Sequence, residues 1–296
     1  MIRTIVSRSL LRAQPARALQ TRARAYATTV ASTADLLKSS SSAGGQATAR
    51  PKVKRFWEKA NVRSDENGHL ICLDSRPIKT SAGNNLVVPK EKTVLAHLIV
   101  KEWATLPSLA IKPHSLPLTS LAARAVDIEQ VSDHDSDAEF IVDGLLPYLD
   151  TDTMLILAPT SEYHGALRQD QEKTYRPIIA WTEEFFGGVR LNVSDGDHGL
   201  TGNMQDEAVK ARAKAWALSL TPWELTAFER AVLGGKSFLA GMQLVLRRMS
   251  TADIAEAVTL EVTHQMRRWG EVEDSHDVDW ADLRRQLGSA AVLVIN

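Results

Sequence analysis

Histidines and carboxylates are the side chains of this sequence that could bind a metal ion or perform acid–base catalysis. Eight histidines are scattered along the chain, and no two of them have the His-Glu-x-x-His spacing of a zinc-binding helix. The single cysteine, Cys72, excludes a zinc site built from several thiolates. One cluster remains, because Glu273, His276 and Asp277 are close in sequence. A metal-dependent enzyme that uses these three side chains is therefore one hypothesis.

Other short motifs lack the residues that their chemistry needs. Gly235-Lys236-Ser237 resembles the end of a phosphate-binding loop, but Arg230 stands where that motif requires a glycine. The acidic run 133–137 resembles the start of a calcium loop, but Ala138 replaces its glycine. The run Asp195-Gly196-Asp197-His198 could in principle bind a metal ion, although a single cluster of this kind is usually a solvated loop. With no complete catalytic motif and no cofactor motif, the sequence favours a binding protein over an enzyme.

The first 34 residues have the composition of a mitochondrial transit peptide. They contain six arginines, several serines and threonines, and no acidic residue. Without them, 29 basic residues face 36 acids, so the remaining chain is acidic and nucleic-acid binding is not expected. The serine- and glycine-rich segment 35–52 has the composition of a flexible linker. No apolar run is long enough for membrane insertion.

We predict that residues 1–34 are removed on import into the mitochondrial matrix. The segment Arg24-Ala25-Tyr26-Ala27 resembles a matrix-protease cleavage site. Sequencing the N-terminus of the protein isolated from mitochondria tests this prediction, and a chain that still begins at Met1 would contradict it.

The rest of the sequence predicts an α+β protein. Short β-prone runs separated by tight turns, including Asn67-Gly68, predict a small antiparallel sheet in an N-terminal domain over residues 53–118. A helix from Pro89 to about Thr105 is expected to cover this sheet. Residues 119–296 are expected to form a mostly α-helical C-terminal domain. Two β-prone pieces, 154–157 and 189–193, could pair with each other or extend the sheet. The helices are expected at about 119–131, 137–149, 163–186, 203–219, 222–248, 251–269 and 279–289.

The stretch 218–248 is predicted to be the central, buried helix. Thr221, Pro222 and Glu224 form a capping box with a proline at the first helical position. Apolar or small residues then recur at helical spacing through Leu246. Three glycines weaken this helix, and their expected benefit is the close approach of a neighbouring helix. The glycines are Gly234, Gly235 and Gly241.

Helix 251–269 places a carboxylate beside an apolar stripe. At 100° per residue, Glu261 falls at the edge of the face that carries Val258, Val262 and Trp269. Such a carboxylate either pairs inside the protein, for example with Arg230 or Arg267, or is offered to a partner. Because an acidic loop follows Trp269, the sequence predicts a partner-binding surface here. Its candidate residues are Glu261, Trp269, Glu271, Glu273 and Asp274, and Glu102 and Trp103 are the next candidates.

Several blocks of sequence resemble the mitochondrial assembly chaperones of the α subunit of F-type ATP synthase. Together they span residues 53–289, and their order and joint presence are more specific than any one of them. The sequence departs from the family pattern at Ser75 and at Leu155-Ile156-Leu157. The blocks are Lys54-Arg55-Phe56-Trp57 with Leu73-Asp74-Ser75-Arg76-Pro77-Ile78-Lys79-Thr80, Glu102-Trp103 with Pro117-Leu118-Thr119-Ser120-Leu121-Ala122, Tyr148-Leu149-Asp150-Thr151-Asp152, and 220–244 with 269–277.

This resemblance implies a protein without catalysis, nucleotide or cofactor. It implies that the protein holds the free α subunit in the mitochondrial matrix until the β subunit arrives. We expect it to act as a monomer. The competing hypotheses are a matrix metal-dependent enzyme that uses Glu273, His276 and Asp277, and a structural subunit of a mitochondrial complex.

Overall fold

The computed structural model describes residues 55–106, 115–131, 134–199 and 202–295. The transit peptide expected over residues 1–34 and the linker expected over 35–52 lie outside these ranges, as does Asp133 at the start of the calcium-like motif. Residues Lys52–Asn296 form one compact unit. Within the described ranges, no helix is long and apolar enough to cross a membrane.

The predicted antiparallel sheet is confirmed, and its central strand β2 pairs with the other three strands. The turn from β1 to β2 depends on Gly68, whose φ is 143°. A Cβ atom there would lie 2.5 Å from the carbonyl oxygen of Val88. Since only glycine avoids this contact, it allows β4 to lie against β2. The strands are β1 (Ala60–Ser64), β2 (His69–Leu73), β3 (Arg76–Pro77) and β4 (Val87–Val88).

Helix α2 (Thr93–Thr105) covers the sheet, as predicted. It contacts β1 and β2 and buries Leu95, Ala96 and Ile99. One hydrophobic cluster contains buried side chains of the sheet, such as Ile71 and Val88, and of the later helices, such as Leu287, so the sheet and these helices share a core. The domain boundary expected at residues 118/119 stays a prediction.

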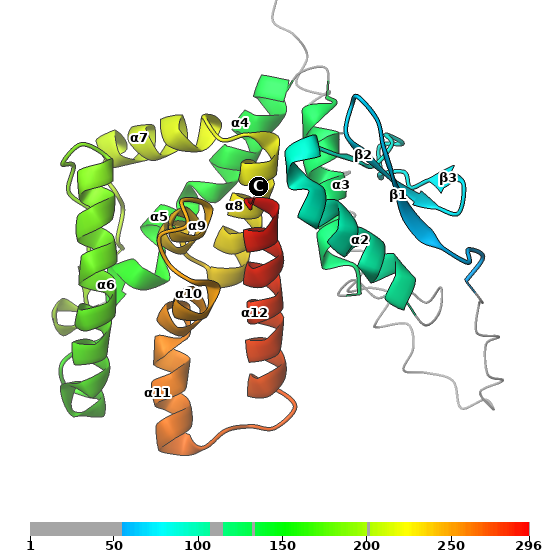
Figure 1. Ribbon diagram of the computed structural model, residues 1–296. Coiled ribbons are helices and arrows are strands. Elements are labelled where there is room, and N and C mark those ends of the chain that lie inside the picture. The colour runs from blue at the N-terminus through cyan, green and yellow to red at the C-terminus, as the bar shows by residue number, and fades with distance from the viewer. Residues whose placement is uncertain (1–54, 107–114, 132–133, 200–201, 296) are drawn as a thin grey trace, which may run out of the picture. The chain divides into compact units, whose positions relative to one another are not determined.

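Helices dominate the remainder of the described chain, which confirms the α+β class. Helix α12 packs along α8, and both contact α3 (Figure 1). The helices of this part are α3 (Pro117–Glu129), α4 (His134–Leu145), α5 (Pro147–Asp150), α6 (Ala166–Phe185), α7 (Glu207–Leu218), α8 (Pro222–Gly235), α9 (Phe238–Val245), α10 (Thr251–Val258), α11 (Leu260–Trp269) and α12 (His276–Leu293). Short 3₁₀ turns occur at η1 (Lys90–Lys92), η2 (Thr153–Leu155), η3 (Glu162–Gly165) and η4 (Gly196–His198).

The prediction of one helix over 222–248 is correct at its start and wrong beyond Gly235. The capping box of Thr221 and Glu224 is present. Lys236 then adopts a left-handed conformation, with φ 50°, and the buried Ser237 begins α9 by accepting a hydrogen bond from the N–H of Ala240. A serine at this position caps a new helix better than it continues an old one.

The two halves of this broken helix pack closely on each other. A Cβ atom on Gly241 of α9 would lie 2.6 Å from Val232 Cγ2 and 2.8 Å from the ring of Phe228 on α8. The close approach of a neighbouring helix, which was predicted for these glycines, is therefore observed at Gly241. The helix that approaches it is α8, the first half of the same predicted helix.

The helix predicted over 251–269 is also two helices. Ser250 caps α10 through the N–H of Asp253, as predicted, and Gly270 ends α11. Thr259 separates the two at φ −109° and ψ 13°, while its hydroxyl donates to the carbonyl of Ala255 at 2.7 Å. Because the helix is interrupted there, the single helical wheel used for residues 251–269 does not describe α11.

Asp152 is a fully buried carboxylate at the N-terminus of α9. Its Oδ2 accepts a hydrogen bond from Leu239 N at 3.0 Å, and its Oδ1 accepts one from Met154 N at 2.9 Å. Burial raises the pKa of Asp152 to about 6, although the hydrogen bonds from α9 and η2 oppose this shift. This one side chain therefore satisfies backbone donors from two separate segments.

Lys92 connects the start of α2 with the end of α12. It is 8% exposed, and its ammonium group donates to the carbonyl of Leu293 at 2.8 Å and to that of Ile295 at 3.3 Å. These carbonyls belong to the end of a helix, where a cation is favourable. Burial lowers the pKa of this ammonium group. The contact joins residues 201 positions apart in sequence.

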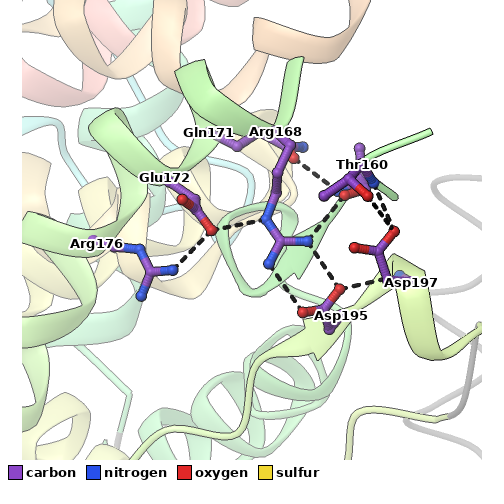
Figure 2. A network of polar contacts seen from close by, with 8 residues as sticks. Thr160, Arg168, Gln171, Glu172, Arg176, Asp195 and Asp197 are labelled. Carbon is purple, nitrogen blue, oxygen red and sulfur yellow. Dashed lines mark hydrogen bonds and ion pairs between the residues drawn. The ribbon is translucent and has the colours of Figure 1, made fainter. Parts of the chain in front are cut away.

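The first β-prone piece of the helical part contains a strand that pairs in parallel, but its partner lies outside the second predicted piece. The pair consists of β5 (Ile156–Leu157) and β6 (Ser194–Asp195), so the second strand lies just beyond the predicted 189–193. Figure 2 shows Arg168 of α6 holding this pair, because its guanidinium donates two hydrogen bonds to Asp195, at 2.8 and 2.9 Å. It also pairs with Glu172. The Arg168 guanidinium holds the pKa of the Asp195 carboxyl well below its usual range.

Candidate functional site

The predicted partner-binding residues that follow α10 lie on one exposed segment. It consists of α11, the loop 270–275 and the first turn of α12, which are continuous in Figure 1. We call it the α11–α12 surface. Apolar side chains on it are exposed by 40 to 68%. They are Val262, Trp269, Val272 and Val278. Acidic side chains on it are also exposed, namely Glu261, Glu271, Glu273, Asp274, Asp277 and Asp279.

Trp269 is the largest exposed apolar side chain of this surface, and it is supported by an aromatic cluster. Its ring meets that of Tyr163 edge to face, with centroids 6.1 Å apart. The Arg268 guanidinium lies 5.6 Å from the centroid of each ring. On the other side, Tyr163 contacts the ring of His264 at 5.8 Å. Such contacts hold an exposed aromatic side chain in place before a partner arrives, which reduces the entropy lost on binding.

His264 fixes α11 onto α6. Its ring is 7% exposed, and its Nε2 lies 2.9 Å from Oδ2 of Asp170. It is the buried residue of α11, whose other side chains are half-buried or exposed. The Asp170 contact and the Tyr163 ring therefore help to hold α11 in place, together with the half-buried Leu260, which packs against the core.

Positive backbone φ angles occur in the loop of this surface and in the turn, residues 163–165, that contacts it. Tyr163, His164 and Gly165 have φ values of 48°, 54° and 78° in succession, and Asp274 has 60°. Non-glycine residues rarely adopt such angles, and they cluster at functional sites. The turn places Tyr163 against Trp269, a contact that the sequence pattern does not predict. Gly165, directly before α6, is the local signal that could have indicated the turn.

Glu261 is exposed and has no arginine partner among the described residues. Its carboxylate accepts a hydrogen bond from the amide of Gln265 at 3.0 Å, one turn along α11. The internal partners considered from the sequence, Arg230 and Arg267, do not pair with it. The side chain is therefore available to a binding partner.

Glu102 and Trp103 belong to the interior contacts of the fold and not to the α11–α12 surface. The Glu102 carboxylate accepts hydrogen bonds from the N–H groups of Leu118 and Thr119, at 2.8 and 2.9 Å, and so caps α3. Trp103 donates its Nε1–H to the Thr119 hydroxyl and packs edge to face on Trp57. Their role as partner-binding residues stays a prediction that this geometry does not favour.

Glu102→Ala is expected to lower the free energy of unfolding by about 1–2 kcal/mol, because two N–H groups of α3 lose their acceptor. Denaturant unfolding measures the loss, and Lys101→Ala, at the exposed neighbouring position, is the control. If both variants unfold like the wild type, Glu102 does not stabilise α3.

Candidate metal ligands from two segments form hydrogen bonds within the protein. His276 accepts a hydrogen bond from the backbone N–H of Val272 at its Nδ1, and Asp195 is bound to Arg168. Within the described ranges, no three His, Cys, Asp or Glu side chains are grouped in a way that could hold a metal ion. The geometry therefore gives the metal-enzyme hypothesis no support.

An exposed aromatic side chain with acidic neighbours on an otherwise compact α+β fold is the composition expected of a protein-binding factor. The family model described as "ATP12 chaperone protein" matches residues 54–183. The chain is 41% identical over 269 residues to "Protein ATP12, mitochondrial" of Saccharomyces cerevisiae, covering 81% of this chain and 83% of the relative. The chain therefore belongs to the ATP12 chaperone family.

Two further comparisons agree with this family. The chain is 38% identical over 244 residues to the mitochondrial atp12 protein of Schizosaccharomyces pombe, covering 82% of this chain and 83% of that one. The crystal structure of Atp12 from Paracoccus denitrificans matches with a TM-score of 0.68 and 25% identity, over 82% of this chain and 97% of that one. The family resemblance is confirmed, and the names of both fungal relatives confirm the expected mitochondrial location.

Proposed function

We propose that this protein is a chaperone of the mitochondrial matrix that binds the free α subunit of F-type ATP synthase and covers its assembly interface until the β subunit joins. It performs this task as a monomer and without catalysis. The observation that carries the proposal is the α11–α12 surface, where the exposed Trp269 is held in place by Tyr163 and Arg268. Membership of a chaperone family supports it.

The physical reason for such a chaperone lies in the client. A subunit whose apolar interface is normally buried in an oligomer aggregates when it is free. A protein that covers the interface, but binds it more weakly than the final partner does, prevents aggregation and is displaced on assembly.

The composition of the α11–α12 surface indicates the chemistry of its partner. Four exposed apolar side chains occur along it together with six exposed acids and two exposed arginines, Arg267 and Arg268. Charge complementarity favours an apolar patch rimmed by lysine or arginine on the α subunit. The acids steer the encounter, while the apolar anchor supplies most of the affinity.

Trp269→Ala is expected to weaken binding of the purified α subunit by about 30-fold or more, because a large central aromatic side chain is lost. Glu261→Lys is expected to weaken it more than Glu271→Gln, since it reverses a charge next to the exposed Val262, whereas Glu271→Gln only removes one. Co-purification and titration calorimetry measure binding, and circular dichroism verifies folding. Met204→Ala removes an equally exposed apolar side chain from the segment before α7 and serves as the control.

A wild-type protein that does not retain the α subunit would overturn the proposed function. If the wild type binds but Trp269→Ala and Glu261→Lys fold and bind equally well, the α11–α12 surface is not the binding site.

A further inference from the structure

A large cleft separates the turns of the β-sheet from the helices that follow it. Its volume is about 960 Å³, at the upper end of the range for ligand-binding sites. The turns of the sheet contribute Asn67 and Asn85, the end of α3 contributes Gln130, and the start of α8 contributes Trp223. We call it the sheet–helix cleft. No residue of the α11–α12 surface lines it.

The inner wall of the cleft is formed by buried side chains. Lys92, Val126, Trp223 and Val294 line it, and each is at most 8% exposed. Lys92 is fixed by the carbonyls at the end of α12. Trp223 is 4% exposed, and its Nε1–H has no hydrogen-bond acceptor among the described residues. A buried donor without an acceptor is uncommon, so this wall has incomplete hydrogen bonding.

The rim of the cleft is rich in side-chain amides. Asn67, Asn85 and Gln130 are exposed, and their side-chain amides have no hydrogen-bond partner within the described part of the chain. Each amide offers both a donor and an acceptor. An extended polypeptide presents the same two groups along its backbone, so amides can bind it with little dependence on its side chains.

The charges around the cleft argue against two other classes of ligand, nucleic acids and lipid chains. Both signs are present, so there is no uniformly basic surface of the kind that binds nucleic acid. The mixture of charges and amides is also unsuitable for a lipid chain, which needs an apolar lining. The basic side chains are Lys90, Lys92 and Arg247, and the acidic ones are Glu66, Glu91, Glu129 and Glu224.

We propose that the sheet–helix cleft is a second client-binding site that holds an extended, polar segment of the α subunit through hydrogen bonds to its main chain. This inference rests on the proposed function for the identity of the client. Two separate sites on one client raise its overall affinity, because the second contact forms at high effective concentration.

The test compares the wild-type full chain with the double variant Asn85→Ala/Gln130→Ala. Neither side chain has a hydrogen-bond partner among the described residues, so thermal unfolding is expected to be unchanged. The probes are overlapping synthetic peptides that together span the α subunit, and the intact α subunit. We expect some peptides to bind the wild type and to bind the double variant about tenfold more weakly, since two hydrogen bonds are lost. Gln169→Ala, which removes an exposed amide from α6, is the control and is expected to bind like the wild type.

The outcomes separate this inference from the proposed function. If the wild type and Trp269→Ala differ in binding the intact α subunit, but the double variant binds peptides and subunit as the wild type does, only the cleft proposal fails. If no peptide binds and the double variant retains the intact subunit fully, the cleft proposal fails as well. If the wild type does not bind the intact subunit, the proposed function fails, and with it the occupant assigned to the cleft.

Discussion

Replacing Asp152 by alanine is expected to lower the free energy of unfolding by about 3 kcal/mol at pH 7. The buried N–H groups of Met154 and Leu239 both lose their acceptor, and each buried donor left without a partner costs about 1–3 kcal/mol. The carboxylate itself is costly to bury, which offsets part of the loss. Urea unfolding measures the effect. Asp150→Ala, two residues away, is expected to cost less, because its carboxylate is partly exposed, pairs with Lys210 and accepts one backbone hydrogen bond, from the N–H of Gln205.

The contribution of Asp152 to the free energy of unfolding is expected to depend on pH. Its pKa rises from 3.8 when unfolded to about 6 when folded, so the folded protein binds more protons between these values. The stability that this group contributes is therefore greatest below about pH 4 and falls as pH rises to about 6, by about 3 kcal/mol in total. Unfolding of the wild type and of Asp152→Asn at several pH values isolates this group. The wild type is expected to lose about 3 kcal/mol of stability relative to Asp152→Asn as pH rises from about 4 to about 6. A difference that stays constant from pH 4 to pH 7 would contradict the prediction.

Phe228→Asp is expected to prevent cooperative folding. Phe228 is fully buried, and its ring meets those of Trp216 and Phe238 edge to face at 5.1 and 4.9 Å. Removing a buried phenylalanine side chain costs about 3–5 kcal/mol, and burying an unpaired carboxylate adds several more. The sum approaches the whole stability of a typical domain, about 5–15 kcal/mol.

Two further variants on α8 are compared with Phe228→Asp, one at an exposed position and one that overpacks a helix contact. Leu233→Asp, where the leucine is 46% exposed, is expected to change the free energy of unfolding by less than about 1 kcal/mol. Gly235→Leu places a large side chain against Val258, because a Cβ atom at position 235 would already lie 3.4 Å from Val258 Cγ1. This variant is expected to cost about 1–3 kcal/mol. Thermal melts followed by circular dichroism measure all three. A normal melt for Phe228→Asp would show that this position is not part of the core.

Features set by a few neighbouring residues could be predicted from the sequence. The caps at Thr221 and Ser250 and the end of α11 at Gly270 each depend on hydrogen bonds within one helical turn. The breaks at Lys236 and Thr259 could not, because both positions follow apolar patterns that continue with helical spacing. The break at Lys236 is stabilised by the packing of α9 on α8, and the break at Thr259 changes the direction of the chain only between α10 and α11.

The residues of the candidate site also differ in whether the sequence predicts their position. Trp269 and its acidic neighbours can be found from the sequence because an exposed loop follows an amphipathic helix. The role of Glu102 could not be predicted in this way. A carboxylate on a partly apolar helix gives the same sequence pattern whether it binds a partner protein or caps a later helix of the same chain. The Tyr163 contact depends on an unusual turn far away in sequence, and the sequence pattern contains no signal for such a pairing.

The Lys92 contact has a consequence for how the chain reaches its native state. A polypeptide threaded through a membrane with its amino end first delivers Lys92 about 200 residues before the carbonyls that it binds at the end of α12. Until those residues emerge, the ammonium group lacks its acceptors, and α3 and α8 lack the helix that packs on them. If the predicted transit peptide directs import with the amino end first, translocation must run nearly to completion before the core can close, and a chain stalled short of α12 is expected to be sensitive to proteolysis.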